Sequence, residues 1–281
     1  MIFDLFCAML RGGDKQRLSQ FKPPPIVAVT ATKNLIIDPI HYQSYCALVD
    51  WDEKNSLHPL YSQMMSLGLQ MQCLADKRNP FPLLGLVHIS NDVWQSMHLD
   101  RHLLLSLHAK LGELKAHPKG WVIDVIIEGH QQGTCVYRAD ASYLMRIHAP
   151  HVAKGTQKQQ KGRQVFWETY QHAAHVHIPD NIGRKYARIS NDYNPIHLFT
   201  ITAKLFGFKQ AIAHGMWSLA KCYSLLETDK HETKNIHLNA DFLKPVLLPA
   251  ECVLMKNSGE TETQFVLLNS ETSEPHIKAK F

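Results

Sequence analysis

The stretch from Tyr186 to Met216, YARISNDYNPIHLFTITAKLFGFKQAIAHGM, constrains this chain more than any other part of it. It places an acid, Asp192, five residues before an imidazole, His197. The Asn194-Pro195 pair between them predicts a turn rather than a continuous helix. Two side chains that can accept or donate a proton are therefore expected to lie close together.

A helix is predicted to begin near Gly215, because the apolar residues after it recur at helical spacing, namely Met216, Leu219, Tyr223 and Leu226. The first backbone N–H groups of a helix have no intrahelical acceptor and lie at the positive end of its dipole. Glycine at that position lets a carbonyl oxygen approach these donors closely. An acid, a base and a donor to an oxyanion are the groups needed to move water across a polarised double bond.

Several residues of this stretch form one motif: Tyr186-Ala187, Ser190, Asp192, Asn194-Pro195-Ile196-His197, Gly207-Phe208 and Ile212-Ala213-His214-Gly215-Met216. The motif resembles the signature of the MaoC-like dehydratases, hot-dog-fold enzymes that include the R-specific enoyl-CoA hydratases. The resemblance implies that Asp192 and His197 bind and activate a water molecule. It also implies that the Gly215 amide holds a thioester carbonyl. The chain departs from the pattern at Asn191, where many members have glycine.

Three residues of the motif are assigned supporting roles. Asn194 is expected to fix the loop that carries Asp192 and His197, and Ser190 and His214 are expected to shape the loop or contact substrate. His214 is left outside the catalytic pair, because a residue at a helix start can instead hydrogen bond locally. The alternative for Asp192 is a turn-forming or capping aspartate. A serine nucleophile at Ser190 is disfavoured, because there is no G-x-S-x-G elbow.

The chain has 281 residues, enough for two domains of ordinary size. In the first half, apolar residues at helical spacing predict a helix over residues 58–74. Strand candidates follow at 83–89, 103–111, 122–127 and 135–143, and a hairpin turn is expected at 129–133. In the second half the helix near Gly215 precedes strand candidates at 236–242, 252–255, 265–268 and 277–281, and 165–170 is a further apolar run. Segments 26–30 and 42–49 are apolar candidates without a definite assignment. One helix followed by an antiparallel sheet in each half suggests a structural duplication.

We therefore expect an α+β protein made of two fused hot-dog units. Residues 1–153 are assigned to a non-catalytic unit with an N-terminal arm, 154–163 to a polar, basic linker and 164–281 to the catalytic unit. The first unit lacks an acid and histidine pair near His58-Pro59. Its His58-Pro59-x-Tyr61 and Leu84-Gly85-Leu86-Val87-His88-Ile89 resemble the amino-terminal half of double-hot-dog members of the same family.

Composition narrows the class of protein further. The net charge of +5 comes without an arginine-rich block or a basic and aromatic run, so no nucleic-acid partner is expected. Six cysteines are scattered without a C-x-x-C pair, which favours reduced thiols. The apolar opening decapeptide is too short to span a membrane, and a cytoplasmic enzyme is expected. No metal or cofactor is expected either, because His172, His175 and His177 lack a recognisable further ligand and no G-x-G-x-x-G motif occurs.

These observations predict reversible hydration of a 2-enoyl thioester to a 3-hydroxyacyl thioester, with the R isomer implied by the resemblance. The expected partner is an acyl-CoA or acyl carrier protein thioester, and the expected assembly is a monomeric pseudo-dimer or a homodimer. Two alternatives remain open, a hot-dog acyl thioesterase and a non-catalytic subunit that binds acyl thioesters. The sequence does not indicate the acyl chain length.

Overall fold

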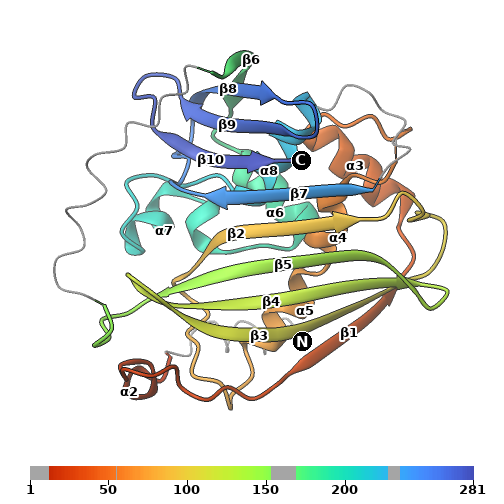
Figure 1. Cartoon of the computed structure of the whole chain (residues 1–281). Coiled ribbons are helices and arrows are strands. Elements are labelled where there is room, and N and C mark those ends of the chain that lie inside the picture. The colour runs from red at the N-terminus through yellow and green to blue at the C-terminus, as the bar shows by residue number, and fades with distance from the viewer. Residues whose placement is uncertain (1–12, 55, 153–168, 227–234) are drawn as a thin grey trace.

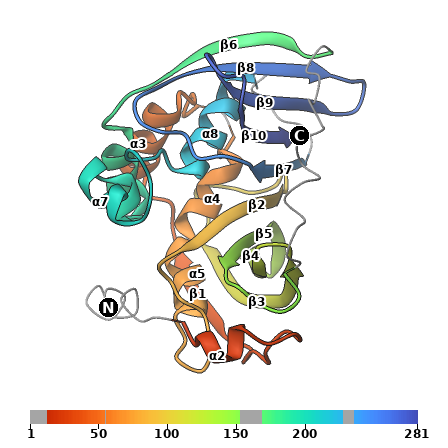
Figure 2. The ribbon, with the colours of Figure 1, turned by 90° about the vertical axis from the view of Figure 1, so that its left-hand side faces the viewer.

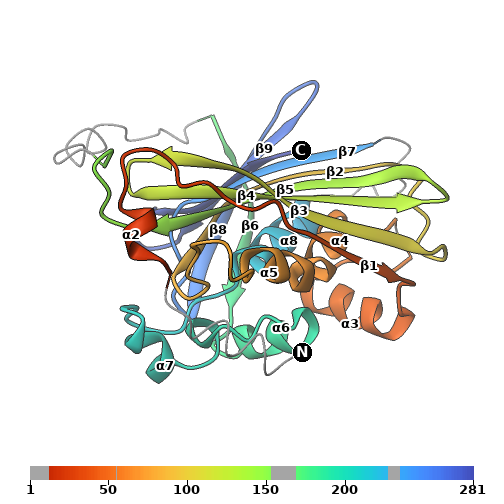
Figure 3. The same cartoon turned by 90° about the horizontal axis from the view of Figure 1, so that it is seen from below.

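The computed structural model describes residues 13–54, 56–152, 169–226 and 235–281. Within these residues, ten strands form one antiparallel sheet, with its strands stacked from top to bottom in Figure 1. The sheet curves around the main helices, which all lie on its concave face (Figure 2). Seen from below, α3, α4, α5, α6 and α8 lie on the same side of the sheet (Figure 3). None of the described helices is long and apolar enough to cross a membrane.

The first half contributes five strands and four helices to the described structure. Its elements are α2 (Lys15–Leu18), β1 (Thr30–Leu35), α3 (Pro39–Val49), α4 (Pro59–Met65), α5 (Leu67–Leu74), β2 (Leu86–Gln95), β3 (Leu105–His117), β4 (Gly120–Gln131) and β5 (Thr134–Arg146). The four strand candidates of this half overlap β2 to β5, although β2 begins only at Leu86 and β3 at Leu105. Gln132 and Gly133 turn the predicted hairpin between β4 and β5 with positive φ.

The second half repeats this order of elements. Its elements are β6 (Gln171–Ile178), α6 (Ile182–Ser190), the 3-10 turn η2 (Pro195–His197), α7 (Thr200–Leu205), α8 (Gly215–Leu226), β7 (Ile236–Phe242), β8 (Ala250–Ser258), β9 (Thr263–Asn269) and β10 (Pro275–Lys280). The predicted helix start at Gly215 is confirmed, as are the four strand candidates that follow it.

The strand order of the sheet is the same read from either edge. It runs β1-β3-β4-β5-β2-β7-β10-β9-β8-β6, so each strand of the first half has a counterpart at the mirrored position. The two halves meet where β2 pairs with β7 over six residue pairs, from Ser90↔Asp241 to Gln95↔Ile236. This arrangement confirms the expected α+β class with two hot-dog units joined through one continuous sheet.

Three expectations need correction or fall outside the description. Segment 42–49 is part of helix α3, because Pro39 occupies its first turn and the Asp38 side chain accepts a hydrogen bond from the Ile40 amide. The single helix expected over 58–74 is divided at Ser66, whose hydroxyl donates to the Gln63 carbonyl at 2.7 Å. Of the N-terminal arm, residues 13–25 are described and include α2, whereas residues 1–12, the linker and most of run 165–170 lie outside the described residues, and β6 begins at Gln171.

The two halves share one core rather than two separate ones. The Trp217 indole on α8 donates to the Leu48 carbonyl on α3 at 3.0 Å. His41 on α3 lies 2.9 Å from the Ile189 carbonyl on α6, and Lys221 pairs with Asp50. The described cysteines, Cys46, Cys73, Cys135, Cys222 and Cys252, are all free thiols, as expected.

Candidate active site

The loop after α6 is held in shape by its own polar side chains. The Ser190 hydroxyl donates to the Tyr186 carbonyl at 2.9 Å and accepts from the Asp192 amide at 3.2 Å. Asp192 Oδ1 in turn accepts from the Asn194 amide at 3.2 Å. Asn194 then caps η2, its side chain accepting from the Ile196 amide at 3.4 Å. Ser190 and Asn194 therefore shape the loop that presents Asp192.

Asn191 occupies the position where many MaoC-like sequences have glycine, and its backbone conformation shows why asparagine is accepted there. It ends α6 in the left-handed conformation, with φ 59° and ψ 19°. Asparagine is among the few residues other than glycine that adopt this conformation readily. The chain can therefore turn from α6 toward Asp192 without a glycine.

His197 lies at the end of η2 with its ring orientation fixed by the backbone. Its Nδ1 lies 2.8 Å from the Ile212 carbonyl, which can only accept, so Nδ1 carries the proton. Burial lowers the pKa of His197, with the Asp192 charge and the Ile212 carbonyl opposing that shift. The ring is therefore neutral near pH 7 and has a free lone pair on Nε2.

His214 holds the other side of the loop. Its Nε2 donates to the Asp192 carbonyl at 3.1 Å and lies 3.7 Å from Asp192 Oδ2. The ring stacks on His197 with 3.7 Å between ring centroids. Burial lowers the pKa of His214 to about 3, assisted by His197 and opposed by Asp192. Two neutral imidazoles thus flank one half-buried carboxylate.

Gly215 places the start of α8 against an aromatic ring. A Cβ atom at this position would lie 2.8 Å from the Phe242 ring, closer than real Cβ contacts. Gly183 on α6 allows a similarly close contact, because a Cβ atom there would lie 1.9 Å from the His197 carbonyl oxygen. Both glycines therefore permit close packing, the first beside the helix start and the second beneath the histidine.

The acid and the two histidines are also close enough to hold a cation. One ligand atom from each of Asp192, His197 and His214 lies within 4.8 Å of the others. His197 Nδ1 and His214 Nε2 are already engaged by carbonyl groups, which leaves one nitrogen on each ring. The same three groups suit a bound water molecule, which needs hydrogen-bond partners rather than a full set of metal ligands.

Among the described residues of the first half, the mirrored position holds no equivalent of this site. Helix α3 ends in a left-handed residue, Asp50, as α6 does at Asn191, but the next residue is the buried Trp51 instead of an acid. His58 stands before α4 as His214 stands before α8, and its ring packs against Trp51, Tyr45 and Tyr223. Aromatic side chains therefore fill this position.

The sequence did not indicate that residues of the first half lie near the loop that carries Asp192. His88 on β2 and Tyr143 on β5 both lie within the field of Asp192. Burial lowers the pKa of His88 and raises the pKa of Tyr143, and the Asp192 charge opposes the first shift and adds to the second. Their ring centroids are 4.8 Å apart, and the Phe242 ring lies 4.9 Å from His88 on the other side. Only the folded sheet, where β5, β2 and β7 are neighbours, brings these residues together.

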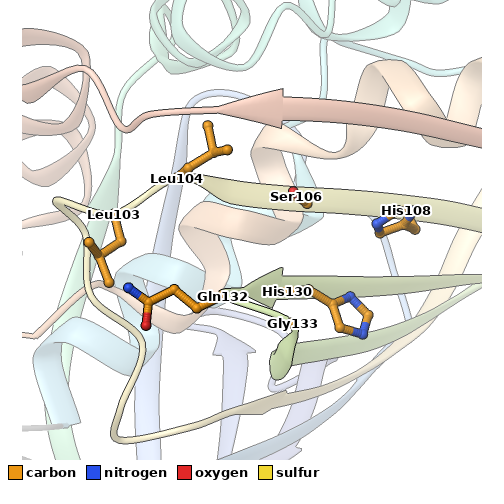
Figure 4. A pocket seen from close by; sticks show the side chains of 7 residues that line it. All are labelled: Leu103, Leu104, Ser106, His108, His130, Gln132 and Gly133. Atoms are coloured by element: carbon orange, nitrogen blue, oxygen red, sulfur yellow. The ribbon is translucent and has the colours of Figure 1, made fainter.

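Two other histidine groups lie away from this loop. His177 on the edge strand β6 is exposed and its Nδ1 lies 2.5 Å from Glu251 Oε1 on β8. A surface hollow on β3 and β4 is lined by Leu103, Leu104, Ser106, His108, His130, Gln132 and Gly133 (Figure 4). Ser106 and His108 alternate with the buried Leu105 and Leu107, so this hollow lies on the sheet face that is turned away from the helices.

The chain combines an antiparallel sheet wrapped around a central helix with an acid and a histidine on the loop that precedes this helix. Residues 156–275 match the family model described as "MaoC like domain". This part of the chain belongs to that family, and the chain as a whole has the hot-dog fold of its members.

Relatives extend the likeness to both halves. Over 255 residues the chain is 26% identical to 3-hydroxyacyl-thioester dehydratase X of Mycobacterium tuberculosis, covering 88% of this chain and 86% of that protein. A crystal structure of HtdX from Mycobacterium tuberculosis matches with a TM-score of 0.76 and 25% identity over 90% of this chain and 98% of the other. A MaoC-like dehydratase from Phytophthora capsici, 19% identical, matches with a TM-score of 0.69 over 90% and 94% of the two chains and shares the fold.

Proposed function

We propose that the chain catalyses the reversible addition of water to a 2-enoyl thioester, giving an (R)-3-hydroxyacyl thioester. Its MaoC-like domain and the relative named 3-hydroxyacyl-thioester dehydratase X support hydration and dehydration of acyl thioesters, which makes the protein a hydro-lyase. The observation that carries the proposal is the convergence of Asp192, His197 and His214 within 4.8 Å beside the start of α8.

The proposed reaction uses one water molecule held by Asp192 and the free Nε2 of His197. As the water oxygen bonds to C3, one of its protons passes to this pair, and the C2–C3 π electrons move toward the thioester oxygen. The Gly215 amide stabilises the resulting enolate-like oxygen. The pair then returns a proton to C2, so that H and OH are added overall and no electrons are exchanged with an outside group.

The proposed carrier of the acyl group is CoA or an acyl carrier protein, both of which bear phosphate. The segment around the catalytic loop carries charges that suit such a group. From residue 181 to 210 the cations are Arg184, Lys185, Arg188, Lys204 and Lys209, whereas Asp192 is the only acid. A phosphate group near this loop would therefore meet an excess of positive charge.

A hot-dog thioesterase is the second candidate that the fold admits. An acyl-ACP thioesterase from Bacteroides thetaiotaomicron matches with a TM-score of 0.57 at 11% identity, a likeness of fold alone. Release of free thiol from an acyl-CoA, followed with a thiol-trapping reagent, separates this activity from hydration. A non-catalytic binding subunit is disfavoured because the acid and histidine stand together on an ordered loop.

The test is incubation with crotonyl-CoA and longer 2-enoyl-CoAs, following loss of absorbance of the conjugated double bond. Asp192→Asn and His197→Ala should each remain folded and lower turnover about a hundredfold or more, the usual effect of removing a positioned proton-transfer group. Asp180→Asn is the matched control, because Asp180 is exposed on the turn before α6. Activity near wild type in either loop variant would refute the assignment of the pair.

A further inference from the structure

A bulge in β2 turns a histidine of the first half toward the helices. The register between β2 and β5 shifts between His88 and Ser90, a local irregularity that re-aims the side chains around it. His88 is directly opposite Tyr143, and opposite residues of an antiparallel pair share one face of the sheet. The Tyr143 hydroxyl donates to Gln70 on α5 at 2.7 Å, so this face is the one covered by the helices.

The His88 ring is held between two aromatic rings on the neighbouring strands. Tyr143 stacks on it at 4.8 Å with an interplanar angle of 20°, and Phe242 lies at 4.9 Å on the other side. Phe242 is also the ring that would meet a Cβ atom at Gly215. His88 is therefore one side chain away from the helix start that receives the thioester oxygen in the proposed reaction.

A chain of hydrogen bonds fixes this aromatic arrangement from behind. Gln70 accepts from Tyr143 and donates through Nε2 to the Ser66 hydroxyl at 2.8 Å. The Ser66 hydroxyl donates to the Gln63 carbonyl at 2.7 Å. The break between α4 and α5 at Ser66 thus helps to set the Tyr143 ring and, through it, the plane of His88.

The Nε2 atom of His88 is enclosed and has no hydrogen-bond partner within the described part of the chain. A buried polar atom without a partner costs about 1–3 kcal/mol, so such an atom calls for an explanation. Burial lowers the pKa of His88 to about 4, opposed by the Ser90 backbone and by Asp192, and the ring is neutral near pH 7. One ring nitrogen of a neutral imidazole carries the proton and the other accepts, so in the tautomer with the proton on Nδ1 the enclosed Nε2 can accept a hydrogen bond.

We propose that His88 is a substrate-binding residue contributed by the non-catalytic half, and that its Nε2 accepts a hydrogen bond from the acyl thioester bound between the halves. This inference rests on the proposed function. Two groups of the ligand can donate, the hydroxyl on C3 of a 3-hydroxyacyl thioester and an amide N–H of the pantetheine arm. The first half then builds one wall of the active site and is more than a structural partner.

The proposal is tested first by kinetics with crotonyl-CoA. His88→Leu should lower kcat/KM about tenfold or more, whereas His88→Gln, which restores an acceptor oxygen, should recover most of the loss. His130→Leu is the matched control on the face of the sheet turned away from the helices. Unchanged kcat/KM in His88→Leu, or equal losses in the leucine and glutamine variants at unchanged Tm, would overturn the proposal.

Binding measurements identify the donor and separate this inference from the hydratase assignment. Calorimetric Kd values for butyryl-CoA and 3-hydroxybutyryl-CoA are compared between Asp192→Asn and the Asp192→Asn, His88→Leu double variant. Weaker binding of both ligands indicates the arm amide, and weaker binding of the hydroxylated ligand alone indicates the C3 hydroxyl. Unchanged binding of both refutes a role for His88, and these outcomes can be read even if wild-type protein hydrates no enoyl-CoA.

Discussion

Asn191 and Asp50 end their helices with the same left-handed backbone, but the residue that follows each of them differs in polarity. After Asn191 comes Asp192, a half-buried carboxylate with two imidazoles beside it. After Asp50 comes Trp51, which is 5% exposed and packs on His58. At equivalent backbone positions, Asp192 thus belongs to a polar loop and Trp51 to an aromatic cluster.

At Gly215 we expect Gly215→Ala to lower kcat/KM by up to about a hundredfold, the scale of losing an oxyanion donor. An added Cβ would crowd both the Phe242 ring and the approach of a carbonyl oxygen to the helix start. Because of the contact with Phe242, we also expect some loss of thermal stability. Steady-state kinetics and thermal unfolding of the same samples measure the two effects.

A second substitution tells these two effects apart. Phe242→Leu added to Gly215→Ala makes room for the Cβ atom and should restore Tm. If activity stays low in this double variant, the blocked approach of the oxygen accounts for the loss. Full recovery of kcat/KM would contradict the role proposed for the Gly215 amide.

At the scale of elements, α6 matters through its contact with the loop that it supports. Its residue Gly183 lies against the His197 carbonyl, and Arg184 of the same helix donates to the Leu198 carbonyl at 3.0 Å. The Thr202 hydroxyl on α7 donates to the Pro195 carbonyl at 2.6 Å from the other side. The short turn η2 is therefore held by a helix on each side, which fixes the position of His197.

We expect Gly183→Ala to displace η2 from α6 and to lower kcat about tenfold or more, with a loss of stability. A Cβ atom 1.9 Å from a backbone oxygen can be accommodated only if the backbone moves. Gly68→Ala is the matched control, because Gly68 is also helical and an added Cβ would meet nothing within 4 Å. The idea fails if both variants keep wild-type kcat and Tm.

The sequence predicted strands β2 to β5 and β7 to β10 and the helix start at Gly215, because alternating burial and helical spacing are local signals. The candidate at 26–30 meets β1 only at Thr30, and the apolar run at 165–170 ends before β6 begins. It did not predict helix α6, whose nine residues carry three cations and a buried serine in addition to its apolar positions. The motif placed Asp192 and His197 near one another, and the structure agrees. His88 and Gly183 could not be found in this way, because their importance depends on contacts with Phe242 and His197, which are remote in sequence.

At the scale of the whole molecule, the halves are joined by the β2–β7 pairing and by shared aromatic packing beneath it. We propose that the chain works as a pseudo-dimer, with domain boundaries near the linker at 154–163. A separated second half would expose the edge of β7 and the apolar faces that α3 and α4 cover.

We therefore expect residues 164–281, expressed alone, to aggregate or to form a dimer with reduced activity. Light scattering coupled to size-exclusion chromatography, together with the crotonyl-CoA assay, measures both properties. The full chain serves as the reference for specific activity per site. A soluble, monomeric and fully active fragment would contradict the pseudo-dimer.

Buried histidines should make the whole molecule sensitive to acid. Burial lowers the pKa of His58 to about 3, of His88 to about 4 and of His214 to about 3, against an ordinary value near 6.5. Below about pH 6.5 the unfolded chain therefore binds more protons than the folded one. The free energy of unfolding then decreases as the pH is lowered, until the pH reaches the pKa values of these histidines in the folded protein. Each such histidine multiplies the unfolding equilibrium constant up to about tenfold per pH unit.

Urea unfolding between pH 7.5 and pH 5 tests this expectation. The number of protons taken up on unfolding, read from the slope of stability against pH, should fall by up to about one in His58→Gln, which removes one buried histidine of the first half. His98→Gln gives the control, because it replaces a histidine that is exposed on the folded surface. Equal slopes in wild type and His58→Gln would show that His58 does not contribute.

The palindromic strand order has a consequence for how such a protein can change over generations. In an assembly of two identical subunits, every substitution appears twice, once on each side of the axis, so a change that suits one side must be tolerated on the other. Joining the two copies through a peptide removes that constraint, because the codon for Trp51 and the codon for Asp192 are then separate. One half can then keep its polar loop while the other acquires residues that would destabilise or inactivate an assembly in which they occurred twice.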